Sequence, residues 1–375
     1  MLLMMAEVLK LCAVSAALPD SGFWKFLCYQ QSHVEWVGCS LHDLIQPSFS
    51  FLVGVVLPFS IAKRLSNGQT FRATALHAVI RSFILIMLGI AILSVHPKHV
   101  IWKFEDTLTQ IGLCYFPLFL LAHRSPREWW LVFAVILFGY WMAFALYPLP
   151  GPDFDYAKVG VSAEWLKEHG LTGFAAHWQK NSNIALAFDN WFLPLFPGNY
   201  PYISSKGLAT LNFVPLMATM ILGLVAGDVL RSGRDPLAKI RWFLITGGAL
   251  LTAGWLMGVL GVCPVVKSIW TPSWVLFSGG LCLLFLTTFY AVVDIWGKKR
   301  VAFPLIVIGL NSIVAYCLTH VFRAFAFNSL RRIVGAGVFS VFGDAYYPLI
   351  YGLAVLVCLW LVLFIMYQRK LFVRI

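Results

Sequence analysis

The sequence predicts an all-α, polytopic integral membrane protein. Of its 375 residues, 60% are hydrophobic and only 12% are charged, and the mean hydropathy is +0.81. A soluble globular domain carries roughly 25% charged residues, so this chain cannot cover a surface that faces water. Its apolar runs are also long enough for helices that cross a bilayer, which need about 20 residues each.

About ten apolar segments are predicted to span the membrane. Together they predict a single membrane domain over residues 1–375. Their approximate ranges are 1–18, 41–62, 75–95, 107–123, 129–149, 208–230, 240–262, 273–295, 301–321 and 346–368.

The basic residues predict the orientation of these segments. Basic clusters follow every second span, and the chain also ends in one, so every short, densely basic loop falls on one side. The positive-inside rule makes that side cytoplasmic, which places both termini in the cytoplasm and the protein in an inner (plasma) membrane as a multi-pass protein. The net charge of +12 therefore reflects topology and does not indicate a nucleic-acid partner.

Two segments depart from this regular pattern. Residues 150–207 form the longest polar stretch and fall on the extracytoplasmic side, where we expect a loop or lid over an outward-facing cavity. At the N-terminus, the apolar run has no basic residue before it and contains Glu7. A signal peptide has a positive leader, so we expect a first transmembrane helix whose beginning is truncated.

The eight cysteines show no CxxC or Cys/His spacing, so no metal site is predicted. Most lie inside apolar runs, where a cysteine packs as a small hydrophobic residue. Cys28 and Cys39 could form a disulfide in an oxidising compartment, or could pack without pairing.

The stretch Gln31–Val55, QSHVEWVGCSLHDLIQPSFSFLVGV, places titratable groups at the entrance of the second span. Asp43 could cap that helix by accepting bonds from its first N–H groups. Alternatively, Asp43 could orient His33, ten residues earlier, as a general base near an outer cavity.

The ninth span, IGLNSIVAYCLTHVF, carries a second set of polar residues. Ser312, Tyr316 and His320 are four residues apart and share one helix face, with Asn311 beside them. Such side chains either bond neighbouring helices or form part of a site, and His320 is predicted at the same outer level as His33.

Three further residues are candidates for a binding site. Lys267 and Trp270 lie in a predicted outer loop, although a tryptophan there can also act as an interfacial anchor. Arg81 falls inside the third span, where a charge is costly and needs a partner or a path to the surface.

These motifs resemble the heparan-alpha-glucosaminide N-acetyltransferase family and its bacterial relatives, over nearly the whole chain. RSFILIMLGI, LTQIGLCYF, PVVKSIWTPSWVLFSGG and GLNSIVAYCLTHVF resemble later signatures of the family. The most specific match is SHVEWVGCSLHDLIQPSFSFLVGV, through His33, Trp36, Gly38, Asp43, Pro47 and Gly54.

The resemblance implies a transmembrane acyltransferase fold and acetyl transfer from cytosolic acetyl-CoA to an amino sugar on the far side. The resemblance implies His33 as base or acetyl carrier, with Asp43 beside it. The family's histidine and asparagine of the late helix correspond to His320 and Asn311. The resemblance also allows a homodimer. Gln110 and Val266 stand where the family has an arginine and an asparagine, so the acceptor need not be heparan sulfate.

Two other function classes fit the composition. A transporter or flippase for a sugar or lipid-linked sugar would also carry intramembrane charges and broken helices. A scaffold protein would have no use for His33, Asp43 and His320 at one membrane level. Consumption of CoA thioester would separate an acetyltransferase from both.

Overall fold

The computed structural model describes residues 1–95, 97, 99–198, 203–335 and 337–373. Throughout that part of the chain the regular elements are helices, and the only strand-like pairing is an isolated bridge between Val37 and Val266. Seven of these helices are long and apolar enough to cross a membrane, or eight if one bent pair forms a single span. The prediction of an all-α membrane protein is confirmed, whereas the predicted count of about ten spans is not.

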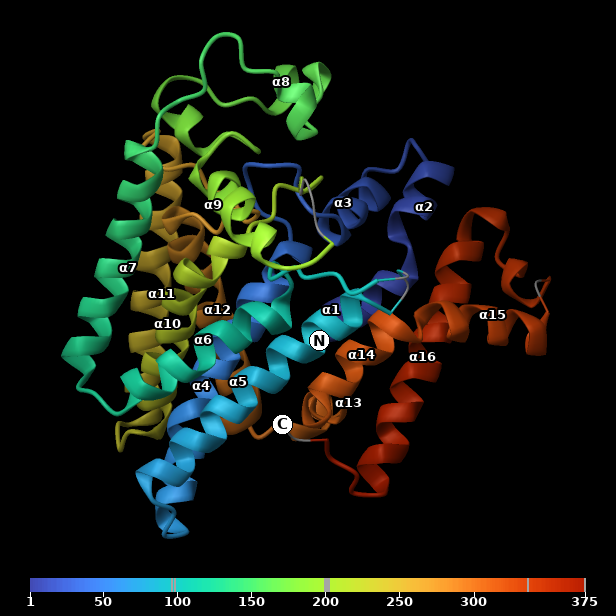
Figure 1. The fold of residues 1–375 in the computed structure, drawn as a ribbon. Helices are drawn as coiled ribbons and strands as arrows, with labels where there is room; N and C mark the ends of the chain where they lie inside the picture. Colours follow the sequence, from blue (N-terminus) through green and yellow to red (C-terminus); the bar gives the residue numbers. More distant parts are fainter. Residues whose placement is uncertain (96, 98, 199–202, 336, 374–375) are drawn as a thin grey trace. The chain divides into compact units, whose positions relative to one another are not determined.

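Figure 1 shows the order of the helices along the chain. The long ones are α4 (Ile45–Ser66), α5 (Phe71–Leu93), α7 (Pro126–Leu146), α10 (Phe213–Arg231), α11 (Pro236–Val259), α12 (Pro272–Phe289) and α16 (Tyr347–Gln368). The others are α1 (Leu2–Met5), α2 (Leu11–Ala17), α3 (Gly22–Gln31), α6 (Thr107–Ala122), α8 (Ala163–His169), α9 (Ile184–Phe192), α13 (Lys299–Leu310), α14 (Ser312–Val321) and α15 (Arg323–Val334).

Three expected spans are shorter or broken. The segment 1–18 divides into α1, the 3₁₀ helix η1 (Ala6–Leu9) and α2, because Lys10 adopts a left-handed conformation with φ of 49°. Helix α6 has only 16 residues. The ninth span bends by 71° between α13 and α14, where Asn311 leaves the helical conformation with ψ of 45°. Hydropathy alone does not reveal such local breaks.

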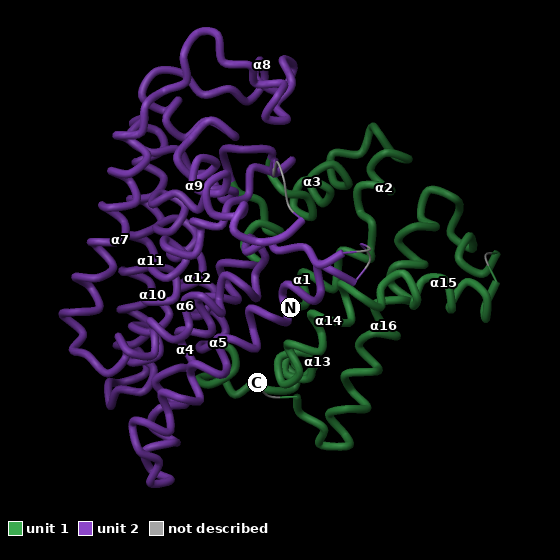
Figure 2. The backbone as a smooth tube through the Cα atoms, viewed as in Figure 1, with its two compact units in different colours: residues 1–34, 39–45, 292–375 green, residues 35–38, 46–291 purple. Residues whose placement is uncertain are grey.

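The chain forms two compact units (Figure 2). Unit 1 contains residues 1–34, 39–45 and 292–375, and unit 2 contains residues 35–38 and 46–291. The core of unit 1 packs Met5 and Val8 with Val355 and Leu359 of α16. Gly352 allows α16 to lie directly against the Val8 carbonyl. The single domain expected over residues 1–375 stays a prediction.

Helices of unit 2 approach closely at glycines. A Cβ at Gly54 of α4 would clash with the Met220 carbonyl of α10, and one at Gly223 or Gly227 would clash with carbonyls of α4. Gly223 and Gly227 form the small-xxx-small pattern that permits such contact between membrane helices. This pair therefore has a packing role.

The disulfide joins Cys12 of α2 to Cys28 of α3, with Cα atoms 4.5 Å apart. The suggested bond between Cys28 and Cys39 is therefore wrong. The partner of Cys28 lies on the preceding helix and is brought close by the turn between α2 and α3.

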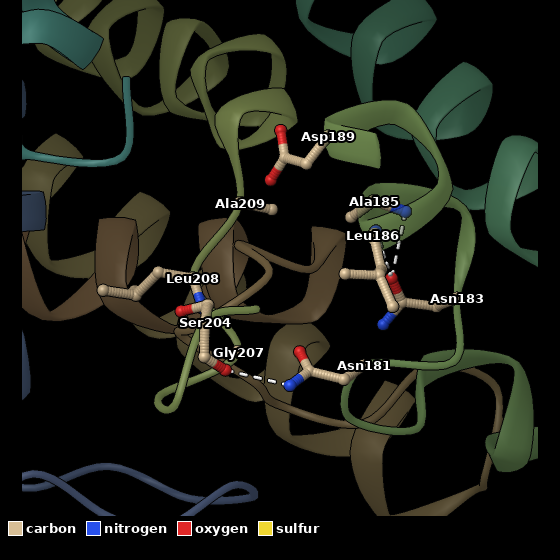
Figure 3. A pocket seen from close by; sticks show the side chains of 9 residues that line it. All are labelled: Asn181, Asn183, Ala185, Leu186, Asp189, Ser204, Gly207, Leu208 and Ala209. Carbon is tan, nitrogen blue, oxygen red and sulfur yellow. Dashed lines mark hydrogen bonds between the residues drawn. The ribbon is translucent and has the colours of Figure 1, made fainter. Parts of the chain in front are cut away.

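Unit 2 buries a carboxylate beside a small cavity lined by residues within 181–189 and 204–209 (Figure 3). Asp189 of α9 is 2% exposed and accepts a hydrogen bond from the Thr210 backbone N–H at 3.2 Å. The cavity has a volume of about 10 Å³, enough for about one water molecule. Burial raises the pKa of Asp189 to about 6.

Stability should therefore fall as the pH rises through the interval between the ordinary aspartate pKa and about 6. In that interval the folded state binds the proton that the unfolded state has released, so ionisation costs more in the fold. Asp189→Asn keeps an acceptor for Thr210 and should flatten this dependence. Thermal unfolding in detergent between about pH 4.5 and 7.5 measures it, and an unchanged slope in the variant would assign the effect to another group.

Candidate functional site

His33 and Asp43 are in direct contact within unit 1. His33 Nδ1 lies 2.7 Å from Asp43 Oδ1, and the Asp43 side chain is 1% exposed while that of His33 is 41% exposed. A carboxylate at Nδ1 favours the tautomer that carries the proton there, so that Nε2 carries the lone pair. The pair therefore has the arrangement of a base and its orienting group.

The second carboxylate oxygen of Asp43 organises the loop before it. Oδ2 accepts hydrogen bonds from the backbone N–H of Val34 at 3.2 Å and of Ser40 at 3.1 Å, and the Ser40 hydroxyl lies 2.9 Å away. These donors precede Asp43 in the chain, so they are not the first N–H groups of the helix that follows. The carboxylate thus orders the loop that precedes it.

A second histidine–carboxylate pair lies beside the first. His42 Nε2 lies 3.2 Å from Glu7 Oε1, and Glu7 Oε2 accepts from Arg323 Nη1 at 3.1 Å. The His33 and His42 ring centroids are 4.5 Å apart. His42 and Arg323 were not among the site residues predicted from the sequence. The position of His42 directly before Asp43 was the sequence signal that could have included it.

Gln31 fixes the segment that carries these groups. Its Oε1 accepts from the Leu11 backbone N–H at 2.7 Å, and its Nε2 donates to the Ala6 carbonyl at 2.7 Å. Both backbone groups flank the helix break at Lys10, where a regular helix would have supplied the bonds. The end of α3, immediately before His33, is therefore tied to the break beside Glu7.

The polar residues of α14 have two different environments in unit 1. His320 is exposed, its Nδ1 donates to the Tyr316 carbonyl at 3.0 Å, and its ring stacks on Tyr316 with centroids 4.1 Å apart. Asn311 is fully buried and bonds the backbone of Leu371 and Val373 at 3.0 Å each. Ser312 begins α14. Asn311 thus joins the start of α14 to the chain segment after α16.

Four other candidate residues belong to unit 2. Trp36 is buried and donates to the Trp178 carbonyl at 3.1 Å. Trp270 is buried and donates to the Thr219 hydroxyl at 3.2 Å, so it is not an interfacial anchor. Arg81 donates to the Tyr115 hydroxyl at 3.2 Å rather than to a carboxylate. Lys267 lies in the loop before α12.

The residues directly after Val34 contact the long polar segment within unit 2. Trp165 Nε1 donates to Glu35 Oε2 at 3.3 Å, and the Lys180 ammonium lies 4.7 Å from the Trp165 ring centroid. Burial lowers the pKa of Lys180, and the Glu35 carboxylate opposes that shift. Trp165 and Lys180 of the long polar segment thus interact with Glu35 and with each other within unit 2.

Over the described ranges, no group of three or more His, Cys, Asp or Glu side chains is arranged to hold a metal ion.

Comparison with known proteins gives two similar curated sequences, although no protein-family model matches the chain. Human heparan-alpha-glucosaminide N-acetyltransferase is 27% identical over 342 residues, which cover 80% of this chain and 49% of that protein. The mouse protein of the same name is 25% identical over 334 residues, with 78% and 49% covered. The chain spans about half the length of these relatives. It is a distant relative of the heparan-alpha-glucosaminide N-acetyltransferases.

Proposed function

We propose that this protein is a transmembrane N-acetyltransferase that moves an acetyl group from cytosolic acetyl-CoA to an amino sugar on the extracytoplasmic side. The observation that carries the proposal is the contact between a half-exposed His33 and a buried Asp43. The distant relationship to N-acetyltransferases supports the reaction class.

The chemistry needs a group that accepts a proton. The amine nitrogen attacks the thioester carbonyl, His33 Nε2 takes the proton from that nitrogen, and the carbon–sulfur bond breaks. CoA leaves as a thiolate and takes up a proton to become the thiol, so the products are an N-acetyl sugar and CoA. Asp43 holds the histidine tautomer and stabilises its cationic form.

A two-step route would use the same nitrogen. The acetyl group would move first to His33 Nε2 and then to the amine, with Asp43 in the same supporting role. Incubation with labelled acetyl-CoA without acceptor, followed by rapid denaturation, distinguishes the routes, because only the two-step route leaves label on the protein.

The disulfide supports the orientation. Disulfides persist in oxidising compartments and are rare in the cytosol. Cys28 lies five residues before His33, and Cys12 is its partner, which supports an extracytoplasmic location for this segment. The basic loops would then face the cytosol, in agreement with the positive-inside rule.

A transporter is the alternative, favoured by the bend of 71° between α13 and α14. Discontinuous helices of this kind form substrate sites in transporters. The first test therefore uses proteoliposomes with labelled acetyl-CoA inside and a panel of amino sugars outside. N-acetyl sugar and free CoA would support the enzyme, whereas sugar movement without loss of acetyl-CoA would support the transporter.

His33→Ala should abolish acetyl transfer in this assay, and Asp43→Asn should lower kcat by at least about 100-fold, because a wrong tautomer at the base removes general base catalysis. Size-exclusion chromatography of both variants controls for folding. Full activity in folded His33→Ala would remove this residue from the chemistry.

His42→Ala should lower kcat less than His33→Ala does, because His42 contacts Glu7 and the ring of His33. His42→Gln, which retains a donor for Glu7, should recover much of the rate. If His42 has a purely structural role, His42→Ala and His42→Gln should both have a lower melting temperature and should not differ in kcat. Melting temperature and kcat are therefore measured together for both variants.

His320→Ala should reduce acetyl transfer only partly, because His320 bonds the Tyr316 carbonyl through Nδ1 and no ion pair among the described residues of unit 1 includes it. Initial rates of acetyl transfer, measured for His320→Ala and His33→Ala in the same assay, show which substitution costs more activity. An inactive, well-folded His320→Ala with an active His33→Ala would exchange the roles of the two histidines.

A further inference from the structure

Unit 1 contains a cavity of about 410 Å³ next to the Glu7–His42 pair. Small-molecule sites have volumes of about 300–1,000 Å³, so this cavity can hold a group of sugar or head-group size. The residues that define its chemistry are Glu7, Lys10, His320, Arg323, Phe327 and Asn328.

The one carboxylate in this wall already has cationic and histidine partners. Glu7 Oε2 is bound by Arg323 at 3.1 Å, and Oε1 by His42 at 3.2 Å. Both oxygens are thus occupied within the protein, which makes Glu7 a poor site for an ammonium group of a ligand.

The remaining charge is positive. The Lys10 ammonium lies 4.9 Å from the Phe327 ring centroid, and none of the ion pairs among the described residues includes Lys10. Lys10 and Arg323 carry two positive charges against one on Glu7, and His320 adds a titratable ring. A cavity with a net positive charge and an exposed amide at Asn328 favours an anionic ligand.

The disulfide indicates the compartment from which this ligand comes. Cys12 is two residues after Lys10 and is bonded to Cys28. Because disulfides persist in oxidising compartments and are rare in the cytosol, the bond favours a ligand that reaches the Lys10 end of the cavity from the extracytoplasmic side, rather than the phosphates of cytosolic CoA.

We propose that this cavity binds a phosphate or carboxylate group supplied from the extracytoplasmic side, with Lys10 as the principal cation and Arg323 as the second. Two sources share this chemistry, an acidic group on a soluble amino sugar and the head group of an anionic lipid. Where the source is the sugar, the inference rests on the proposed acetyl transfer and narrows the acceptor to an acidic amino sugar.

The test measures binding to the full chain in phosphatidylcholine nanodiscs without acetyl-CoA. Calorimetric titrations compare glucosamine 6-phosphate with glucosamine. In a second arm, phosphatidylglycerol is added to the nanodiscs and the shift in melting temperature is followed. The variants are Lys10→Gln, the charge-preserving Lys10→Arg, and Lys25→Gln, which removes an exposed lysine of α3 in the same unit.

We expect wild type and Lys25→Gln to bind the phosphorylated sugar about tenfold more tightly than glucosamine, as a charge-assisted contact to phosphate implies. Lys10→Gln should lose this preference and Lys10→Arg should retain it. A Lys10-dependent shift with phosphatidylglycerol alone would instead identify the lipid source. The proposal is overturned if neither arm depends on Lys10 while Lys10→Gln remains folded.

Because these titrations contain no acetyl-CoA, they are independent of the enzyme reaction. Lys10-dependent binding together with no CoA release in proteoliposomes would retain the anion site and reject the acetyltransferase. CoA release without Lys10-dependent binding would support the acetyltransferase and reject the anion site.

Discussion

The arrangement of the candidate site depends on one buried carboxylate. Asp43 is 1% exposed, and its two oxygens serve different purposes: Oδ1 contacts His33, while Oδ2 gathers the backbone N–H groups of Val34 and Ser40. Burying a carboxylate is costly unless hydrogen bonds or charges satisfy it. The loop between the two residues must therefore close around Asp43, and this closure brings a histidine ten residues away into contact. Orientation of the imidazole and folding of the loop are consequences of the same set of bonds.

A second constraint comes from the interrupted first segment. A helix break leaves backbone groups without partners, which is especially unfavourable in an apolar environment. Lys10 creates the break, and the Gln31 amide satisfies the Leu11 N–H and the Ala6 carbonyl on its two sides. The disulfide between Cys12 and Cys28 joins the same two chain segments. Glu7 and the end of α3 are thereby held together. The position of these polar groups thus depends on residues 1–18, a segment that hydropathy alone predicts to be one continuous helix.

The sequence allowed the fold class and the central pair to be predicted, because both depend on information close together in the chain. Apolar length defines a span, and His33 and Asp43 lie in one motif. The breaks at Lys10 and Asn311 depend instead on the conformation of single residues and on distant partners, such as Leu371 and Val373 for Asn311. Likewise, Arg323 lies more than 300 residues after Glu7, and no local pattern connects them. Contacts of this kind require the three-dimensional structure, as does the pairing of Cys12 with Cys28.

The two histidine–carboxylate pairs are best understood together. Two imidazole rings with centroids 4.5 Å apart disfavour simultaneous positive charges. Each ring has its own carboxylate, Asp43 for His33 and Glu7 for His42, but Arg323 shares Glu7 and already offsets its charge. Within the proposed reaction, His33 is the base, and His42 connects its ring to Glu7 and the adjoining cavity.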